Sequence, residues 1–228
     1  MNDSEHSINA KALSFFERMA TSGQCNQNSV KLAKNSDYSD MDVAFLRKYT
    51  TRESTVLDLG AGTGLIVNKL YPHVKNIVAV EPFTRFTRFI AATEGITVVH
   101  QTVSEFTTTA KFDLISLFGL MHYVDESQAK EIYTKYIKYL KREGIMIIKN
   151  QFGLTEDITI NGYSEELQEN YSAQYRQIDK EVRLLREAGF GHVAVVDIYP
   201  KECNRWNNTH FFALVAAKQP QGLQPRTN

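Results

Sequence analysis

Short apolar runs alternate with longer amphipathic segments along most of the chain. The apolar runs lack the alternation of a half-exposed strand, which is typical of strands buried on both faces of a sheet. The segments between them repeat apolar residues at helical spacing. Strands that alternate with helices favour an α/β fold with a parallel sheet and right-handed crossovers. We predict such strands at Thr55–Leu59, Asn76–Val80, Ile96–Val99, Phe112–Phe118 and Ile145–Ile148.

The alternation changes after the fifth predicted strand. Phe152–Glu169 shows no clear period and predicts an irregular insertion, and a helix that carries Tyr175 and Leu185 follows. The last two predicted strands are Val193–Ile198 and His210–Ala217. Too few residues join them for a helical crossover, so we expect them to pair antiparallel.

A glycine-rich loop follows the first predicted strand. Gly60, Gly62 and Gly64 occupy alternate positions, and a helix comes next. Such a loop lets a ligand lie close against the backbone, and a helix N-terminus points N–H groups toward it. The spacing differs from the G-x-G-x-x-G of dinucleotide sites, and the Gly-Lys-Ser/Thr of a P-loop is absent. Asp58 lies just before the glycines, where it would repel a pyrophosphate and attract an ammonium group.

A second acidic residue, Glu81, ends the second predicted strand. Nucleotide-binding α/β folds place an acidic residue at about this distance from the glycines. Together, Asp58 and Glu81 favour a nucleoside that carries an amino acid.

The composition of the chain limits the kinds of partner that we expect. The 228 residues carry a formal net charge of zero, which argues against non-specific nucleic-acid binding. No apolar run approaches membrane-spanning length, and the polar, acidic start of the chain is unlike a signal peptide. Cys25 and Cys203 lack metal-ligand spacing. We therefore expect a cytoplasmic protein with no metal site and no membrane or nucleic-acid partner.

Three segments together resemble the class I S-adenosylmethionine-dependent methyltransferases: Val56–Gly64, Val80–Pro82 and Phe112–Ser116. The resemblance covers roughly residues 54–149. It implies a Rossmann-like, doubly wound seven-stranded sheet with helices on both faces. The implied strand order is 3-2-1-4-5-7-6, mostly parallel with an antiparallel last strand. It also implies S-adenosylmethionine as cofactor and S-adenosylhomocysteine as product.

The resemblance assigns roles to residues around the donor. Glu81 would hold the ribose hydroxyls and Asp58 the ammonium group, directly or through water. The polar adenine contact would fall to Thr102 or to the backbone N–H of Val103. The full set of expected donor-binding residues is Asp58, Gly60, Ala61, Gly62, Gly64, Glu81, Pro82, Phe83, Thr102, Val103, Phe118 and Gly119. Within it, Phe83 packs either on adenine or in the core, and Phe118 and Gly119 would border the sulfonium.

The acceptor would enter at the carboxyl ends of the fourth and fifth strands. His122 follows the fourth strand and is either a general base or a structural histidine that orients its loop. Arg176 or Arg205 would meet an anion, and Tyr171 and Tyr175 would share one helix face. The residues that we expect to bind the acceptor are Tyr123, Asn150, Gln151, Tyr171, Tyr175, Arg176 and Trp206.

These expectations divide the chain into parts. We expect N-terminal helices that can serve as a lid in residues 1–50, and the S-adenosylmethionine-binding domain in 51–218. Residues 150–175 would be an insertion on the acceptor side, and 219–228 a disordered tail.

The favoured function is methyl transfer from S-adenosylmethionine to an O or N atom of a small polar acceptor, such as a sugar or surface-glycan precursor. One alternative is an NAD-dependent oxidoreductase, which the glycine spacing and Asp58 disfavour. Another is a relative that binds S-adenosylmethionine without catalysis. The oligomeric state stays open.

Overall fold

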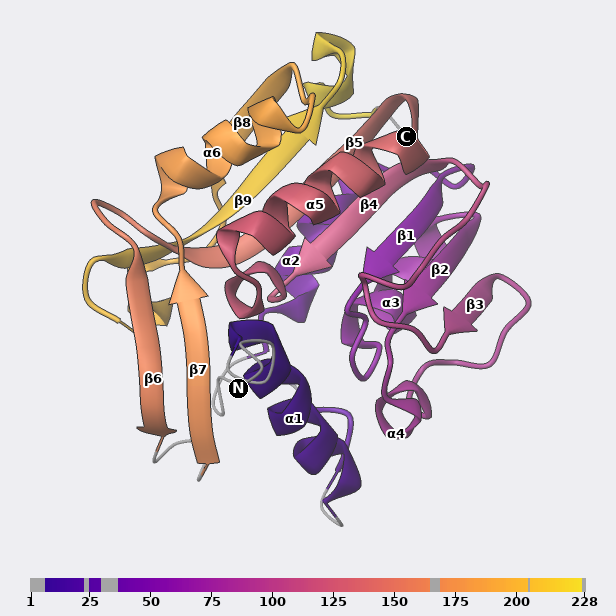
Figure 1. Ribbon diagram of the computed structural model, residues 1–228. Helices are drawn as coiled ribbons and strands as arrows, with labels where there is room; N and C mark the ends of the chain where they lie inside the picture. Colours follow the sequence, from indigo (N-terminus) through magenta and orange to yellow (C-terminus); the bar gives the residue numbers. More distant parts are fainter. Residues whose placement is uncertain (1–6, 23–24, 30–36, 165–168, 205, 227–228) are drawn as a thin grey trace.

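The computed structural model describes residues 7–22, 25–29, 37–164, 169–204 and 206–226. Within them, a seven-stranded sheet has the order β3-β2-β1-β4-β5-β9-β8 (Figure 1). Strand β9 is antiparallel to both β5 and β8, and the other pairs are parallel. The α/β class and the implied order are thus confirmed. The strands are β1 Thr55–Leu59, β2 Asn76–Val80, β3 Ile96–Val99, β4 Phe112–Phe118, β5 Leu140–Gly153, β8 His192–Asp197 and β9 Thr209–Ala217.

Helices cover both faces of this sheet. Alternate residues of β4 belong to different apolar clusters: Ile115 and Leu117 pack with residues of α5 and α6, whereas Leu114 packs with residues of α2 and α3. Each of the three side chains is fully buried, as expected for a strand between two helical layers. The helices are α1 Ile8–Thr21, α2 Ser39–Arg47, α3 Leu65–Leu70, α4 Thr84–Thr87, α5 Glu126–Tyr136 and α6 Ile178–Glu187.

A small hairpin stands outside the sheet, where the sequence predicted an irregular insertion. Strands β6 Ile158–Ser164 and β7 Glu169–Tyr175 pair antiparallel and form their own two-stranded sheet. The prediction was wrong because alternate apolar residues, such as Ile158 and Ile160, give this segment a period of two that is short and set among polar residues. Its apolar face packs with α1, which lies beside β7 below the carboxyl ends of β1 and β4 (Figure 1).

The boundary between β7 and α6 also differs from the prediction. Helix α6 begins at Ile178, and the Gln177 side chain caps it by accepting a hydrogen bond from Lys180 N at 3.1 Å. Tyr171 and Tyr175 therefore lie on a strand and not on a helix. Residues four apart share a face in either structure, so the shared face survives on a different backbone.

The C-terminal segment does not match the disorder that we expected for residues 219–228. Pro220–Leu223 forms a 3-10 helix, and Arg226 N donates a hydrogen bond to Lys48 O at 2.7 Å. Residues 227–228 lie outside the described chain. The segment therefore packs against the end of the domain through contacts that its polar composition does not reveal.

Candidate functional site

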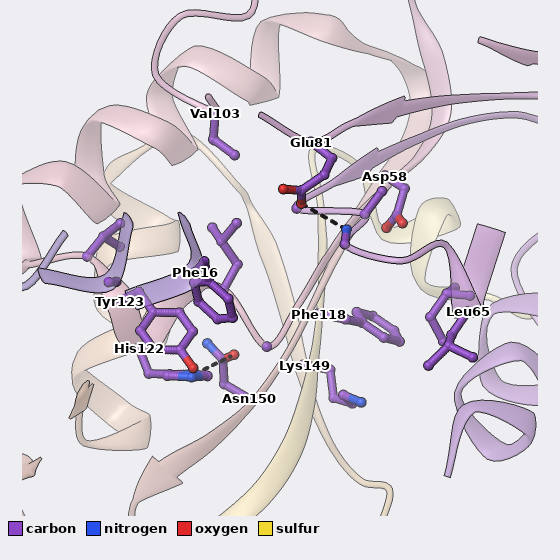
Figure 2. A pocket seen from close by; sticks show the side chains of 18 of the residues that line it. Phe16, Asp58, Leu65, Glu81, Val103, Phe118, His122, Tyr123, Lys149 and Asn150 are labelled. Atoms are coloured by element: carbon purple, nitrogen blue, oxygen red, sulfur yellow. Dashed lines mark hydrogen bonds between the residues drawn. The ribbon is translucent and has the colours of Figure 1, made fainter. Parts of the chain in front are cut away.

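A cavity of about 360 Å³ lies at the carboxyl ends of the central strands. Its floor is formed by residues that end β1, β2, β4 and β5, and helix α1 covers it through Asn9, Leu13 and Phe16. Figure 2 shows Asp58 and Glu81 at one end of the cavity and His122, Tyr123 and Asn150 at the other. In open α/β sheets this edge is where ligands bind.

The glycine loop turns tightly between β1 and α3. Gly60, Gly62 and Gly64 have φ values of 74°, 53° and 76°, a region that side chains with a Cβ rarely adopt. Gly60 N donates to Val80 O at 2.9 Å, which holds the loop against β2. Gly60 and Gly62 line the cavity. Gly64 does not: it precedes α3, and a Cβ there would lie 2.4 Å from Ile90 Cγ1.

Glu81 connects this loop to the segment after β2. Its Oε2 accepts from Gly62 N at 2.9 Å and its Oε1 from Phe83 N at 3.1 Å, and the residue is 6% exposed. Burial raises the pKa of Glu81 to about 7; the two N–H groups act in the opposite direction, and the Asp58 charge adds to the rise. Each carboxylate oxygen keeps a further lone pair, so the group can also accept from ligand hydroxyls.

Asp58 is the second buried carboxylate in the cavity. Ser116 Oγ on the neighbouring strand donates to its Oδ1 at 2.6 Å. Burial raises the pKa of Asp58 to about 6, and the Ser116 hydrogen bond only partly opposes this rise. A bound cation would favour the ionised form. The site therefore fits the ammonium group of an amino-acid moiety.

Gly119 indicates whether the cavity has room for a ligand directly above β4. Its φ is 69°, it lines the cavity, and a Cβ built on it would meet no atom within 4 Å. The absence of a side chain therefore keeps space open directly above β4. Phe118, which the sequence placed beside Gly119, also lines this space.

The cavity is also lined by four residues that the sequence assigned to donor binding: Pro82, Phe83, Thr102 and Val103. The Thr102 hydroxyl donates to Glu105 Oε2 at 2.8 Å, and Thr102 N donates to the same oxygen at 3.0 Å. These bonds direct the polar groups of Thr102 toward Glu105. Val103, whose carbonyl accepts from Tyr136 OH at 2.8 Å, lines the cavity, and the adenine contact through its backbone N–H stays a prediction.

His122 lies on a 3-10 turn, Met121–Tyr123, directly after β4. Its Nδ1 is 3.3 Å from Oδ1 of Asn150, which lies in the C-terminal part of β5 (Figure 2). Because a carboxamide oxygen only accepts, Nδ1 carries the proton and Nε2 carries the lone pair. The imidazole also stacks on Tyr175, with ring centroids 5.3 Å apart. The structure thus orients this imidazole from two sides.

Arg176 lies outside the cavity and forms a buried ion pair. Its Nε is 2.5 Å from Glu181 Oε2, and the two residues are 3% and 0% exposed. Its guanidinium donates to the carbonyls of Met121, the first residue of the turn that bears His122, and of Val124, which follows that turn. The expectation that Arg176 meets a ligand anion does not fit this geometry. Arg176 instead holds the His122 turn in place.

Two other expected acceptor residues also lie behind the cavity wall. Tyr171 OH is 2.9 Å from Tyr175 OH, and Trp206 Nε1 donates to Tyr175 OH at 3.2 Å. They anchor Tyr175, which does line the cavity together with Tyr123, Asn150 and Gln151. Arg205 lies outside the described residues.

Several lining residues were not identified from the sequence. Helix α1 lies in the segment that we expected to serve as a lid, but the sequence did not single out Ala12 and Phe16, which line the cavity. No local sequence pattern marks the rest, because residues such as Lys149 and Asp42 meet only in the folded chain. The further lining residues on the side of α2 and β9 are Tyr38, Asp42, Lys149, Tyr199 and Phe211.

Comparison with known proteins agrees with this geometry. Residues 56–144 match the family model described as a methyltransferase domain. No curated protein sequence matches the chain. Among the described residues, no group of three or more His, Cys, Asp or Glu side chains could hold a metal ion, and none of the helices has the length and apolar character of a membrane span.

Solved structures of methyltransferases share the fold at low identity. A Leishmania major S-adenosylmethionine-dependent methyltransferase is 18% identical, with a TM-score of 0.71 over 94% of this chain and 84% of that one. The Burkholderia thailandensis 1,6-didemethyltoxoflavin N1-methyltransferase, solved with S-adenosylhomocysteine, is 18% identical, with a TM-score of 0.68 over 91% and 89%. Haemonchus contortus phosphoethanolamine N-methyltransferase 1 is 15% identical, with a TM-score of 0.72 over 100% of this chain and 53% of that one.

The family match favours methyl transfer over the oxidoreductase alternative. The glycine loop and the two buried carboxylates lie within the matched segment, and the sheet has the implied strand order. The chain therefore carries a methyltransferase domain at residues 56–144, within a fold that solved S-adenosylmethionine-dependent methyltransferases share.

Proposed function

We propose that the enzyme transfers the methyl group of S-adenosylmethionine to an O or N atom of a small polar acceptor. The observation that carries this proposal is the His122–Asn150 pair. It lies in the same cavity as Gly119, at the carboxyl ends of β4 and β5, beyond the two buried carboxylates. A cavity of about 360 Å³ beneath α1 suits a nucleoside-sized donor with a small acceptor and not a macromolecule.

The end of the cavity that contains Asp58 and Glu81, which we call the donor end, binds S-adenosylmethionine and orients it. S-adenosylmethionine, when bound, supplies an electrophilic methyl group on a sulfonium. Asp58 holds the ammonium group, and Glu81 accepts from the ribose hydroxyls while the backbone N–H groups of Gly62 and Phe83 keep its carboxylate in place. Gly119 leaves room at the end of β4 for the reacting groups. These contacts align the donor for an in-line displacement.

The end of the cavity that contains His122, which we call the acceptor end, removes a proton from the acceptor. As an O or N atom of the acceptor bonds to the methyl carbon, the carbon–sulfur bond would break with its electron pair on sulfur, which leaves S-adenosylhomocysteine. The proton that the acceptor loses would pass to Nε2 of His122. The Nδ1–H bond to Asn150 fixes the tautomer that makes this transfer feasible. Aromatic rings of Phe16, Tyr123 and Tyr175 line this end and exclude water.

A sugar or surface-glycan precursor is our specific expectation for the acceptor. Carboxamides beside aromatic rings suit a molecule that carries several hydroxyl groups. The names of two fold relatives, an N1-methyltransferase of 1,6-didemethyltoxoflavin and a phosphoethanolamine N-methyltransferase, also describe small-molecule acceptors. They support the small size of the acceptor and leave its chemical class to experiment.

The test is a methylation screen of metabolite extract with trideuteromethyl-labelled S-adenosylmethionine, read by mass spectrometry. We expect a small polar product that carries the label and that forms with the wild-type enzyme but much more slowly with His122→Phe. Binding of S-adenosylhomocysteine without any labelled product would favour the non-catalytic relative. Tight binding of NAD in calorimetry would contradict the proposal.

A further inference from the structure

The cavity extends to the α2 side of the sheet, away from His122. Strand β5 points alternate side chains to opposite faces, so Lys149 and Gln151 lie on the face opposite Asn150. Figure 2 shows Lys149 beside Phe118, apart from the His122–Asn150 pair. Asp42, Lys149, Gln151, Tyr199 and Phe211 line this region, which we call the β5–β9 compartment.

The positive charge of Lys149 in this compartment is balanced by the carboxylate of Asp42. Lys149 Nζ lies 2.6 Å from Asp42 Oδ2 and donates to Tyr199 OH at 2.8 Å, and Tyr199 OH donates to Asp42 Oδ1 at 2.6 Å. Both oxygens of Asp42 are therefore engaged. Asp42 is 4% exposed, so the pair is shielded from solvent. The compartment is strongly polar but carries no net charge from this pair.

Gln151 adds a hydrogen-bond acceptor without a partner. The residue is 2% exposed, and its Oε1 has no hydrogen-bond partner among the residues that the structure describes. Its Nε2 donates to Thr209 Oγ1. A buried carbonyl oxygen without a partner is unfavourable, so this atom is available to accept a hydrogen bond from a ligand.

The orientation of this carboxamide follows from its neighbour. Thr209 Oγ1 donates its hydrogen to the carbonyl of Trp206 at 2.5 Å. A hydroxyl has one hydrogen, so toward Gln151 it can only accept. Gln151 must therefore present its NH₂ group to Thr209. Its oxygen is left as the group that can accept a hydrogen bond from a ligand.

We propose that the β5–β9 compartment binds an uncharged hydroxyl or primary carboxamide group of the methyl acceptor, with Gln151 Oε1 accepting from that group and Lys149 donating to it. This inference rests on the proposed function, because it concerns the second substrate. The rings of Phe118, Tyr199 and Phe211 supply apolar contact beside the polar groups. An anion suits the compartment less well, because Asp42 already neutralises Lys149 and Gln151 Oε1 would repel it.

The experiment measures the affinities of three matched probes for the enzyme saturated with S-adenosylhomocysteine, by ligand-observed NMR. Benzamide donates and accepts, N,N-dimethylbenzamide only accepts, and benzoate is an anion. We expect benzamide to bind about fivefold more tightly than the other two, since one neutral hydrogen bond contributes about 1 kcal/mol. Gln151→Leu should abolish this preference.

Thr209→Val is the matched control. It removes the same Gln151–Thr209 hydrogen bond as Gln151→Leu but keeps the Gln151 oxygen, so the preference for benzamide should persist. Tightest binding of benzoate, a preference that survives in Gln151→Leu, or no binding of benzamide to the loaded enzyme would each overturn the inference. Calorimetry with S-adenosylhomocysteine precedes the probes: absence of that binding would instead count against the proposed function.

Discussion

Binding of the donor should depend on pH through Asp58. Burial holds the pKa of this carboxyl at about 6 in the ligand-free protein, and the expected ligand carries an ammonium group. The ammonium favours the ionised carboxylate, so binding lowers the pKa of Asp58 and affinity rises with pH. At pH 5, one unit below that pKa, about one tenth of the molecules carry the charge. We therefore expect S-adenosylhomocysteine to bind about tenfold more weakly at pH 5 than at pH 8.

The assay is isothermal titration calorimetry with S-adenosylhomocysteine between pH 5 and 8. Asp58→Asn should bind more weakly at pH 8 and lose the part of the pH dependence centred near pH 6. Ser116→Ala offers a matched control, because it removes the hydrogen bond that lowers the pKa of Asp58. The midpoint should then move to higher pH. An affinity that stays constant from pH 5 to 8, or that Asp58→Asn leaves with the same dependence, would refute the assignment.

The same two carboxyls affect the stability of the ligand-free protein. Their folded-state pKa values, about 6 for Asp58 and about 7 for Glu81, lie above the ordinary values of 3.8 and 4.5. Between about pH 4 and pH 7 the folded state thus binds more protons than the unfolded state. The free energy of unfolding should fall as pH rises through this window and recover when S-adenosylhomocysteine is added.

Three further changes test other parts of the site. Glu81→Ala should weaken S-adenosylhomocysteine binding by about 1–3 kcal/mol in calorimetry, and unchanged affinity would contradict the ribose assignment. His122→Ala should lower turnover more than donor affinity; a purely structural histidine would affect both, or neither. Arg176→Met leaves Glu181 buried without its cation and should lower the free energy of unfolding by about 3–5 kcal/mol in urea. Restoring charge with Arg176→Lys should recover part of that stability but less turnover than wild type, since one ammonium cannot span Met121 O and Val124 O; full recovery of turnover would argue against this positioning role.

The sequence predicts the sheet well and the acceptor side poorly, for physical reasons. Buried parallel strands such as Thr55–Leu59 are continuous apolar runs, and the glycine loop carries a local spacing that needs no tertiary context. Arg176 shows the opposite case: its type suggested an anion site, whereas its partner Glu181 lies on the next helix and is visible only once both are folded. The Lys149–Asp42 pair joins residues of β5 and α2, so no local pattern announces it.

Phe16 of α1 connects the two halves of the cavity. Its ring centroid lies 5.2 Å from that of Tyr123 on the acceptor side and 6.4 Å from that of Phe86 near the donor end. A shift of this ring when one substrate binds would change the shape of the other half of the cavity. We therefore expect the affinities of donor and acceptor to be coupled, and such coupling is reciprocal. The two substrates would then bind cooperatively, because each helps to form the wall that the other needs.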